Sequence, residues 1–237
     1  MSELVIALDY PDASGAMDMA GKLAGVVPWV KVGLELFTAE GPPMVTDLKE
    51  MGFKVFLDLK FHDIPNTVKG AVRSATRLGA DMVNIHAIGG RRMAEGALEG
   101  RDQGTAPGQQ PPILLAVTVL TSVGKGDIPL ENAPEPGDLA LDLAVKAEQY
   151  GLSGVVCSAL ETERIKGRCG NDFYCLTPGI RPVDKGAAVG ADDQRRVVTP
   201  AQAVRFGSDF LVVGRPVTGA TDPKQAARLI MDEMLQA

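Results

Sequence analysis

Two charged residues within an apolar segment are the first feature of this sequence that suggests chemistry. Residues 55–61 read V-F-L-D-L-K-F, a run typical of a buried strand, yet it contains Asp58 and Lys60. Side chains two residues apart on a strand point to the same face, so a carboxylate and an ammonium would project together, with Asp63 just beyond. Because burying an ion is costly unless it is paired, we expect these charges to form an ion pair or to take part in catalysis.

The elements that must position these charges follow a strand–helix alternation. Eight short apolar runs are expected as strands, and mostly continuous apolar strands favour a parallel sheet. At this length eight such units predict a single (β/α)8 TIM barrel, of the α/β class, over residues 1–237. A doubly wound open sheet is the second possibility, although no G-x-G-x-x-G follows the first strand. The expected strands are residues 4–8, 29–32, 55–59, 82–85, 113–120, 154–157, 174–176 and 210–213.

Helices are expected between these strands, and several have recognisable first residues. Ser14 and Asp138 are predicted N-caps, and Thr199 is a cap followed by a proline at the first helical position. Pro65 suits a first helical turn, with Ile64 at the cap position. The expected helices are residues 14–23, 43–51, 68–78 preceded by that first turn, 91–98, 138–150, 161–166, 200–206 and 223–235, and residues 104–112 are an expected surface loop.

Composition excludes several classes of protein. The chain has 237 residues, of which 45% are hydrophobic and 23% charged, as in ordinary soluble domains. A net charge of −6 argues against a nucleic-acid or acidic-membrane partner. Cys157, Cys169 and Cys175 form no disulfide framework, which indicates a reducing, cytoplasmic location. The N-terminus has no signal-peptide pattern, and no apolar run is long enough to span a membrane.

Polar residues collect at the predicted C-terminal ends of the strands, where (β/α)8 barrels carry their chemistry. Each also has a structural explanation: Asp9 could form a turn, Lys31 could extend its ammonium to solvent, and Asp58 with Lys60 could be a structural ion pair. His62 and His86 are better explained as hydrogen-bonded structural histidines than as catalysts. The rim residues are Asp9, Lys31, Asp58, Lys60, Asp63, His86, Thr121, Arg181, Gly214 and Arg215.

A second group of residues suits a phosphate. Gly214 after the last strand would let backbone N–H groups approach a ligand, and Arg215 would add a bidentate cation. The glycine-rich segment 178–198, which contains Arg181 and Gln194, resembles a closing lid, with a disordered surface loop as the alternative. The sequence contains no zinc signature, no G-x-S-x-G and no Walker A motif.

These motifs together resemble the orotidine 5′-phosphate decarboxylase family. The matching segments run in order across nearly the whole chain, and the combined set is specific, although D-x-K-x-x-D alone is shared with a wider suprafamily. The segments are A-L-D (7–9), K-V-G (31–33), D-L-K-F-H-D-I-P-N-T (58–67), L-T-S (120–122), T-P-G-I-R-P (177–182), D-D-Q-R-R (192–196) and V-V-G-R-P-V-T (212–218).

The resemblance implies a role for each matched residue. It implies that orotidine 5′-monophosphate is converted to uridine 5′-monophosphate without cofactor or metal, with Lys60 as proton donor to C6 and Asp58 beside the substrate carboxylate. Lys31 would complete the charged array and contact the ribose with Asp9, and Thr121 would contact the pyrimidine. Gln194, Gly214 and Arg215 would hold the phosphate, with Arg181 on the closing loop. Asp63, Ile64 and Thr67 would reach the neighbouring subunit's site, which implies a homodimer.

Two alternatives remain open at this point. The first is a Mg²⁺-dependent ketogulonate-phosphate decarboxylase or hexulose-phosphate synthase of the same suprafamily, in which an acidic residue would stand where this chain has Lys31. The second is a catalytically silent barrel that binds a nucleotide monophosphate. The intact Asp58, Lys60 and Asp63 argue against the second, because binding alone does not need a costly array of charges.

Overall fold

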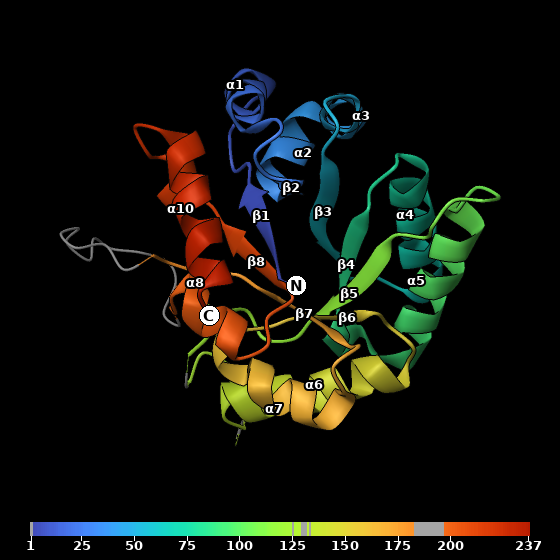
Figure 1. The fold of residues 1–237 in the computed structure, drawn as a ribbon. Coiled ribbons are helices and arrows are strands. Elements are labelled where there is room, and N and C mark those ends of the chain that lie inside the picture. The colour runs from blue at the N-terminus through green and yellow to red at the C-terminus, as the bar shows by residue number, and fades with distance from the viewer. Residues whose placement is uncertain (1, 125, 129–131, 133, 183–196) are drawn as a thin grey trace.

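Eight parallel strands close into a barrel with the helices outside it (Figure 1). The computed structural model describes residues 2–124, 126–128, 132, 134–182 and 197–237. Each strand pairs with its neighbours in chain order, and β1 closes the ring by pairing with β8. The predicted (β/α)8 barrel is therefore confirmed, and the open doubly wound sheet is excluded.

Successive side chains along each strand point alternately into two apolar clusters. Phe56, Met82 and Leu115 belong to a cluster inside the barrel, while a larger cluster fills the space between strands and helices. Because alternate residues of a strand share a face, the positions two residues after Phe56 and Met82 also face the interior. The strands are β1 Glu3–Ala7, β2 Trp29–Gly33, β3 Lys54–Phe61, β4 Met82–His86, β5 Ile113–Val117, β6 Gly154–Val156, β7 Tyr174–Thr177 and β8 Phe210–Val213.

The helices cover the outside of the barrel (Figure 1). Two short helices, α2 and α9, were not expected from the sequence, and β5 ends at Val117 rather than at residue 120. The helices are α1 Ala13–Leu23, α2 Leu34–Glu40, α3 Pro42–Glu50, α4 Pro65–Arg77, α5 Gly90–Gly104, α6 Pro136–Gln149, α7 Ala159–Cys169, α8 Pro200–Arg205, α9 Arg215–Thr218 and α10 Pro223–Leu235, with a 3-10 turn η1 at Ala87–Gly89.

Two of the predicted helix caps are wrong. The N-cap of α1 is Asp12, whose side chain accepts a hydrogen bond from the backbone N–H of Gly15 at 2.9 Å, and Ser14 lies inside the helix. Asp138 is in the first turn of α6, because Pro136 already provides a preformed first helical residue. In both cases the helix begins earlier than its apolar pattern suggests.

Two other predicted helix starts are confirmed. Pro65 is the first residue of α4 and Ile64 is its N-cap. Thr199 caps α8, where its hydroxyl accepts from the backbone N–H of Gln202 and the Gln202 side chain accepts from the backbone N–H of Thr199. This reciprocal capping box satisfies two backbone donors that the helix leaves unpaired.

Close packing of α4 against α5 depends on a stripe of glycines. Gly96, Gly100 and Gly104 recur every fourth residue along one face of α5. A Cβ atom at Gly96 would lie 2.8 Å from the carbonyl oxygen of Pro65, and one at Gly100 would lie 2.2 Å from that of Lys69. The two backbones therefore touch, which fixes the helix that directly follows the charged strand β3.

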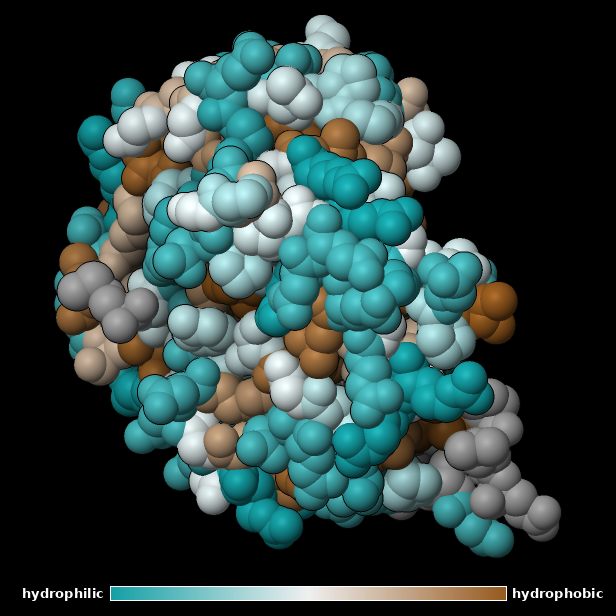
Figure 2. Space-filling view, turned by 90° about the vertical axis from the view of Figure 1, so that its right-hand side faces the viewer, coloured by the Kyte–Doolittle hydropathy of each residue, from teal (hydrophilic) through white to brown (hydrophobic). Residues whose placement is uncertain are grey.

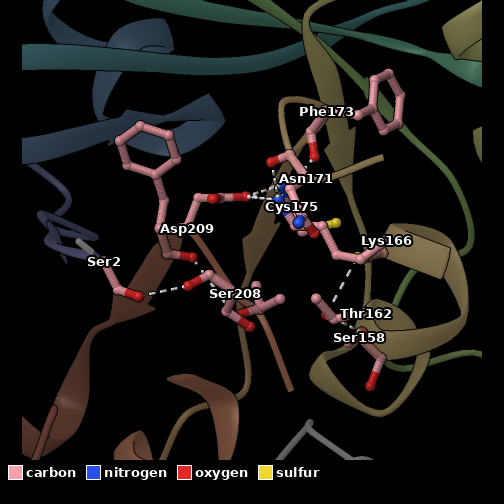
Figure 3. A network of polar contacts seen from close by, with 12 residues as sticks. Ser2, Ser158, Thr162, Lys166, Asn171, Phe173, Cys175, Ser208 and Asp209 are labelled. Carbon is pink, nitrogen blue, oxygen red and sulfur yellow. Dashed lines mark hydrogen bonds and ion pairs between the residues drawn. The ribbon is translucent and has the colours of Figure 1, made fainter. Parts of the chain in front are cut away.

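At the opposite end of the barrel from these charges, Asp209 precedes β8 and anchors the start of β7 (Figure 3). Its Oδ2 accepts hydrogen bonds from the backbone N–H of Cys175 and from Lys166 Nζ, each at 2.7 Å. Lys166 also donates to the carbonyl oxygens of Asn171 and Phe173. The ammonium thus has three acceptors, as a largely buried lysine requires.

The same arrangement recurs half a barrel away. Asp81 precedes β4, and its Oδ2 accepts from the backbone N–H of Val55 at 2.7 Å and from Lys49 Nζ at 2.6 Å. Both aspartates end a short related segment, G-A-D at 79–81 and G-S-D at 207–209. The starts of β3 and β7 are therefore anchored by the same local arrangement, whose short sequence pattern is difficult to recognise from the sequence alone.

The outer surface shown in Figure 2 is mainly hydrophilic, with hydrophobic residues in small separate groups. In the part of the chain that the structure describes, no helix is both long and apolar enough to cross a lipid bilayer.

Candidate active site

A cavity of about 550 Å³ lies at the C-terminal ends of the strands, where the sequence placed the chemistry. Eight of the predicted site residues line it: Asp9, Lys31, Asp58, Lys60, Thr121, Arg181, Gly214 and Arg215. They come from or directly follow β1, β2, β3, β5, β7 and β8. Closure of the barrel thus brings together residues that are more than 200 positions apart in the chain.

Four charges of alternating sign cross one side of this cavity. Lys31 Nζ lies 2.8 Å from Asp9 Oδ1 and 3.4 Å from Asp58 Oδ2. The other oxygen of that carboxylate, Asp58 Oδ1, accepts from Lys60 Nζ at 2.7 Å. The side chain of Asp58 is 11% exposed and that of Lys31 is 10% exposed, whereas Asp9 is 59% exposed. The two central members of the array are therefore buried, whereas Asp9 at one end faces solvent.

The ion pairs hold the two buried groups in their charged forms. Burial by itself would raise the pKa of Asp58, but the attraction of Lys31 and Lys60 and the hydrogen bonds of Lys60 and Asn84 leave it below its ordinary value. Burial likewise acts to lower the pKa of Lys31, and Asp58 and Asp9 reverse that effect and raise it. The site is thus built to keep its carboxylate and ammonium ionised.

The backbone of β3 departs from regular strand geometry at Lys60. Its φ angle is +50°, in the left-handed region that residues other than glycine rarely adopt. The pairing of β3 with β4 also shifts register between Leu57 and Phe61. Lys60 therefore approaches Asp58 from a bulged segment, whereas the sequence predicted two side chains of a regular strand.

Asn84 is a site residue that the sequence reasoning missed. It lies in the middle of β4 and is completely buried. Its Nδ2 donates to Asp58 Oδ1 at 2.8 Å, and its Oδ1 accepts from the backbone N–H of Lys60 at 2.8 Å. The available signal was an amide within the otherwise apolar start of a strand, M-V-N-I, because a buried amide needs partners.

Gly33 leaves the space that the Lys31 ammonium occupies. A Cβ atom on Gly33 would lie 3.0 Å from Lys31 Nζ and 3.2 Å from Asp9 Oδ1. Both distances are shorter than ordinary van der Waals contact. The glycine of the K-V-G segment therefore admits the ion pair that begins the array.

The predicted phosphate-binding residues in the described part of the chain follow β7 and β8, and β8 pairs with β1. Gly214 follows β8 and is the N-cap of α9, which begins at Arg215. Arg181 follows β7, and its backbone N–H donates to the carbonyl oxygen of Val198 at 2.9 Å. That bond joins the two described ends of the predicted lid. Gln194 lies outside the described residues.

The single chain does not bring Asp63, Ile64 or Thr67 into the cavity. All three are exposed, Ile64 to 68%, and none is among the described residues that line the cavity. Asp63 Oδ1 accepts a hydrogen bond from the backbone N–H of Ile64 at 2.6 Å. These residues start α4 on the outer surface of this chain.

The two histidines form a pair beside the array. The ring centroids of His62 and His86 are 5.5 Å apart. Burial, His62 and Lys60 together lower the pKa of His86, and Asp58 opposes them. Neither ring lines the cavity formed by the described residues, and the hydrogen-bonded structural role expected of them from the sequence stays a prediction.

A closed (β/α)8 barrel whose mouth holds paired carboxylates and ammonium groups together with two arginines defines an enzyme for a small anionic substrate. The sequence model of the Orotidine 5'-phosphate decarboxylase / HUMPS family matches residues 2–230, and the chain belongs to that family.

Individual relatives agree with this assignment. The chain is 63% identical to orotidine 5'-phosphate decarboxylase from Maridesulfovibrio salexigens and 61% identical to that from Nitratidesulfovibrio vulgaris, in each case over 99% of this chain and 98–99% of the relative. A crystal structure of orotidine 5'-phosphate decarboxylase from Lactobacillus acidophilus superposes with a TM-score of 0.86 at 38% identity, covering 99% of each chain.

Proposed function

We propose that this protein decarboxylates orotidine 5′-monophosphate to uridine 5′-monophosphate, the last step of de novo pyrimidine biosynthesis. The observation that carries the proposal is the array of Asp9, Lys31, Asp58 and Lys60 within one cavity of a barrel of this family. A reaction that removes CO₂ from a carbon without an electron sink needs a fixed positive charge at that carbon, and Lys60 would provide it.

The proposed chemistry requires one proton from the enzyme. The bond between C6 and the carboxylate breaks, its electron pair stays on C6, and CO₂ leaves. The Lys60 ammonium then transfers a proton to C6, which yields the product and a neutral amine that solvent reprotonates. Asp58, 2.7 Å from Lys60 Nζ, would hold the ammonium beside C6 and face the substrate carboxylate before it departs.

The remaining residues would bind parts of the substrate that do not react. Asp9 and Lys31 would contact the ribose hydroxyls and Thr121 the pyrimidine. Arg215 and the Gly214 backbone would hold the phosphate together with Gln194, and Arg181 would join them as the 178–198 segment closes. Binding energy from this remote phosphate would then drive closure and exclude water from the reacting carbon.

We also propose a homodimer in which Asp63, Ile64 and Thr67 complete the neighbouring subunit's site. Their exposure on the single chain supports this assignment, since exposed side chains can contact a neighbouring subunit. The unpaired cysteines Cys157, Cys169 and Cys175 fit the cytoplasmic location proposed with it.

We propose that the reaction is independent of metal. Lys31 occupies the position where metal-dependent relatives would carry an acid, and its ammonium pairs with both Asp9 and Asp58. A cation there repels Mg²⁺ and occupies the oxygens that would bind it. The Mg²⁺-dependent alternative therefore requires a site that this array already fills.

The test is an absorbance assay of orotidine 5′-monophosphate loss with and without excess chelator. We expect the same turnover in both conditions, with uridine 5′-monophosphate as product. If chelator abolishes turnover and Mg²⁺ restores it, the proposed independence of metal is wrong. If the chain binds uridine 5′-monophosphate but never consumes the substrate, it is a silent binding barrel.

A further inference from the structure

Asn84 stands out among the residues that face the barrel interior. It follows Met82 by two positions on β4, so its side chain points to the inside of the barrel, where it is completely buried. An amide in such a place loses its bonds to water and must find partners of its own. Both partners belong to the charged array.

The orientation of the Asn84 amide is determined by chemistry. The backbone N–H of Lys60 can only donate, so it must meet the amide oxygen, at 2.8 Å. The Asp58 carboxylate is ionised and can only accept, so it must meet the amide nitrogen, at 2.8 Å. A flipped amide would lose both bonds, and Asn84 therefore connects the two central residues of the site in one defined orientation.

The bulge in β3 explains why a side chain is needed here. Because the pairing shifts between Leu57 and Phe61, residues 58–60 lie opposite Asn84 alone. Lys60 has a left-handed φ of +50°, and its N–H bonds to the Asn84 side chain in place of a backbone carbonyl of the neighbouring strand. The amide thus holds the unusual backbone conformation from which the Lys60 side chain extends.

We propose that Asn84 is a positioning residue for the decarboxylation. It fixes Lys60 through its backbone and fixes the plane of the Asp58 carboxylate through Oδ1, the same oxygen that accepts from Lys60 Nζ at 2.7 Å. Lys60 is then held at two points, at its backbone N–H by Asn84 and at its ammonium by Asp58, which sets the distance of the ammonium from C6. This inference rests on the proposed function and adds to it a residue that would touch no substrate atom.

Two substitutions test the two hydrogen bonds of the Asn84 side chain, one by removing both and the other by removing only the bond to Asp58. Asn84→Leu keeps the approximate volume and removes both bonds. Asn84→Asp keeps an acceptor for the Lys60 N–H but replaces the donor that faces Asp58 with a second carboxyl group. The charged and titratable groups already around Asp58, among the described residues, are Lys31, Lys60, Asp9 and His86.

For Asn84→Leu we expect kcat to fall about 100-fold, the scale of a misplacement of about 1 Å, with affinity for uridine 5′-monophosphate kept because the phosphate-binding side is intact. For Asn84→Asp we expect the acidic limb of the kcat–pH profile to move to higher pH. The substitution removes the amide N–H that donates to Asp58 and adds a second carboxyl group beside it. Both changes favour protonation of this carboxyl pair and so raise its pKa.

The control is Asp209→Asn at the far end of the barrel, where a partly buried Asp is likewise bonded to a backbone N–H. It should lower the melting temperature and leave kcat and its pH profile unchanged. The proposal is overturned if both Asn84 variants behave like this control, or if uridine 5′-monophosphate affinity falls together with kcat. If Asn84→Leu does not fold, Asn84→Asp alone decides through its pH profile. Turnover by the wild type tests the proposed function separately.

Discussion

Each charged residue of the array Asp9, Lys31, Asp58 and Lys60 lies against a residue of opposite charge. Lys31 and Asp58 could be predicted to meet because both stand near the ends of neighbouring strands, and their contact at 3.4 Å confirms this. Asn84 could not be predicted, since its partner is a backbone N–H that only the bulge at Lys60 makes available. A prediction from sequence patterns treats each strand as regular, so it does not find contacts that an irregular backbone creates.

His86 gives a prediction for stability against pH at this scale. Its pKa in the folded protein lies below the ordinary value of 6.5, because burial, His62 and Lys60 disfavour the charged form. Between the folded pKa and about 6.5 the unfolded chain binds more protons, so stability falls as the pH falls through this window and is unaffected by His86 above it. Thermal melts across this range measure the slope.

In those melts His86→Gln should flatten the decline, and His62→Gln should lessen it by removing a neighbouring positive charge. If the melting temperatures of the wild type and of His86→Gln depend on pH in the same way, the decline is not caused by protonation of His86. The two variants also serve as matched controls for each other, since both replace an imidazole by an amide.

At the scale of elements, all eight strands were predictable because each is a short and mostly apolar run. Long helices were predictable from their periodicity, whereas α2 and α9 are too short to show one. The caps at Ser14 and Asp138 were misplaced because polar residues before the true start provide equally good signals.

The contact of α4 with α5 gives a prediction for stability. In Gly100→Ala the new methyl group would lie 2.2 Å from the Lys69 carbonyl oxygen. The helices must then separate, and overpacking of this kind costs about 1–3 kcal/mol or more in the free energy of unfolding. Urea unfolding measures the difference.

The matched control is Gly167→Ala in α7, where a Cβ atom would meet nothing within 4 Å. There the alanine should stabilise by up to about 1 kcal/mol through its helix propensity. Equal stability of the two variants would show that the helices are not in backbone contact.

At the scale of the whole molecule, the proposed homodimer predicts that two inactive variants restore each other. Lys60→Ala removes the proton donor of its own site, and Asp63→Ala removes a group from the neighbouring site. In a mixed dimer one of the two sites keeps both residues. Half of the dimers in an equal mixture that has exchanged subunits are mixed, so we expect about a quarter of wild-type activity.

The measurement is the specific activity of the mixture after refolding together, compared with the two variants assayed separately and then combined without exchange. Recovery only after exchange supports the shared site. No recovery, with dimers verified by sedimentation, would place Asp63 in its own chain's site or outside the site.

The most direct test of the central claim is turnover of orotidine 5′-monophosphate by Lys60→Ala and by the wild type in the absorbance assay. We expect kcat to fall by at least about a thousandfold, because the variant lacks both the positive charge at C6 and the proton donor. Its melting temperature and its affinity for uridine 5′-monophosphate should show an intact fold and binding site. A folded Lys60→Ala protein that retains wild-type kcat would contradict the account.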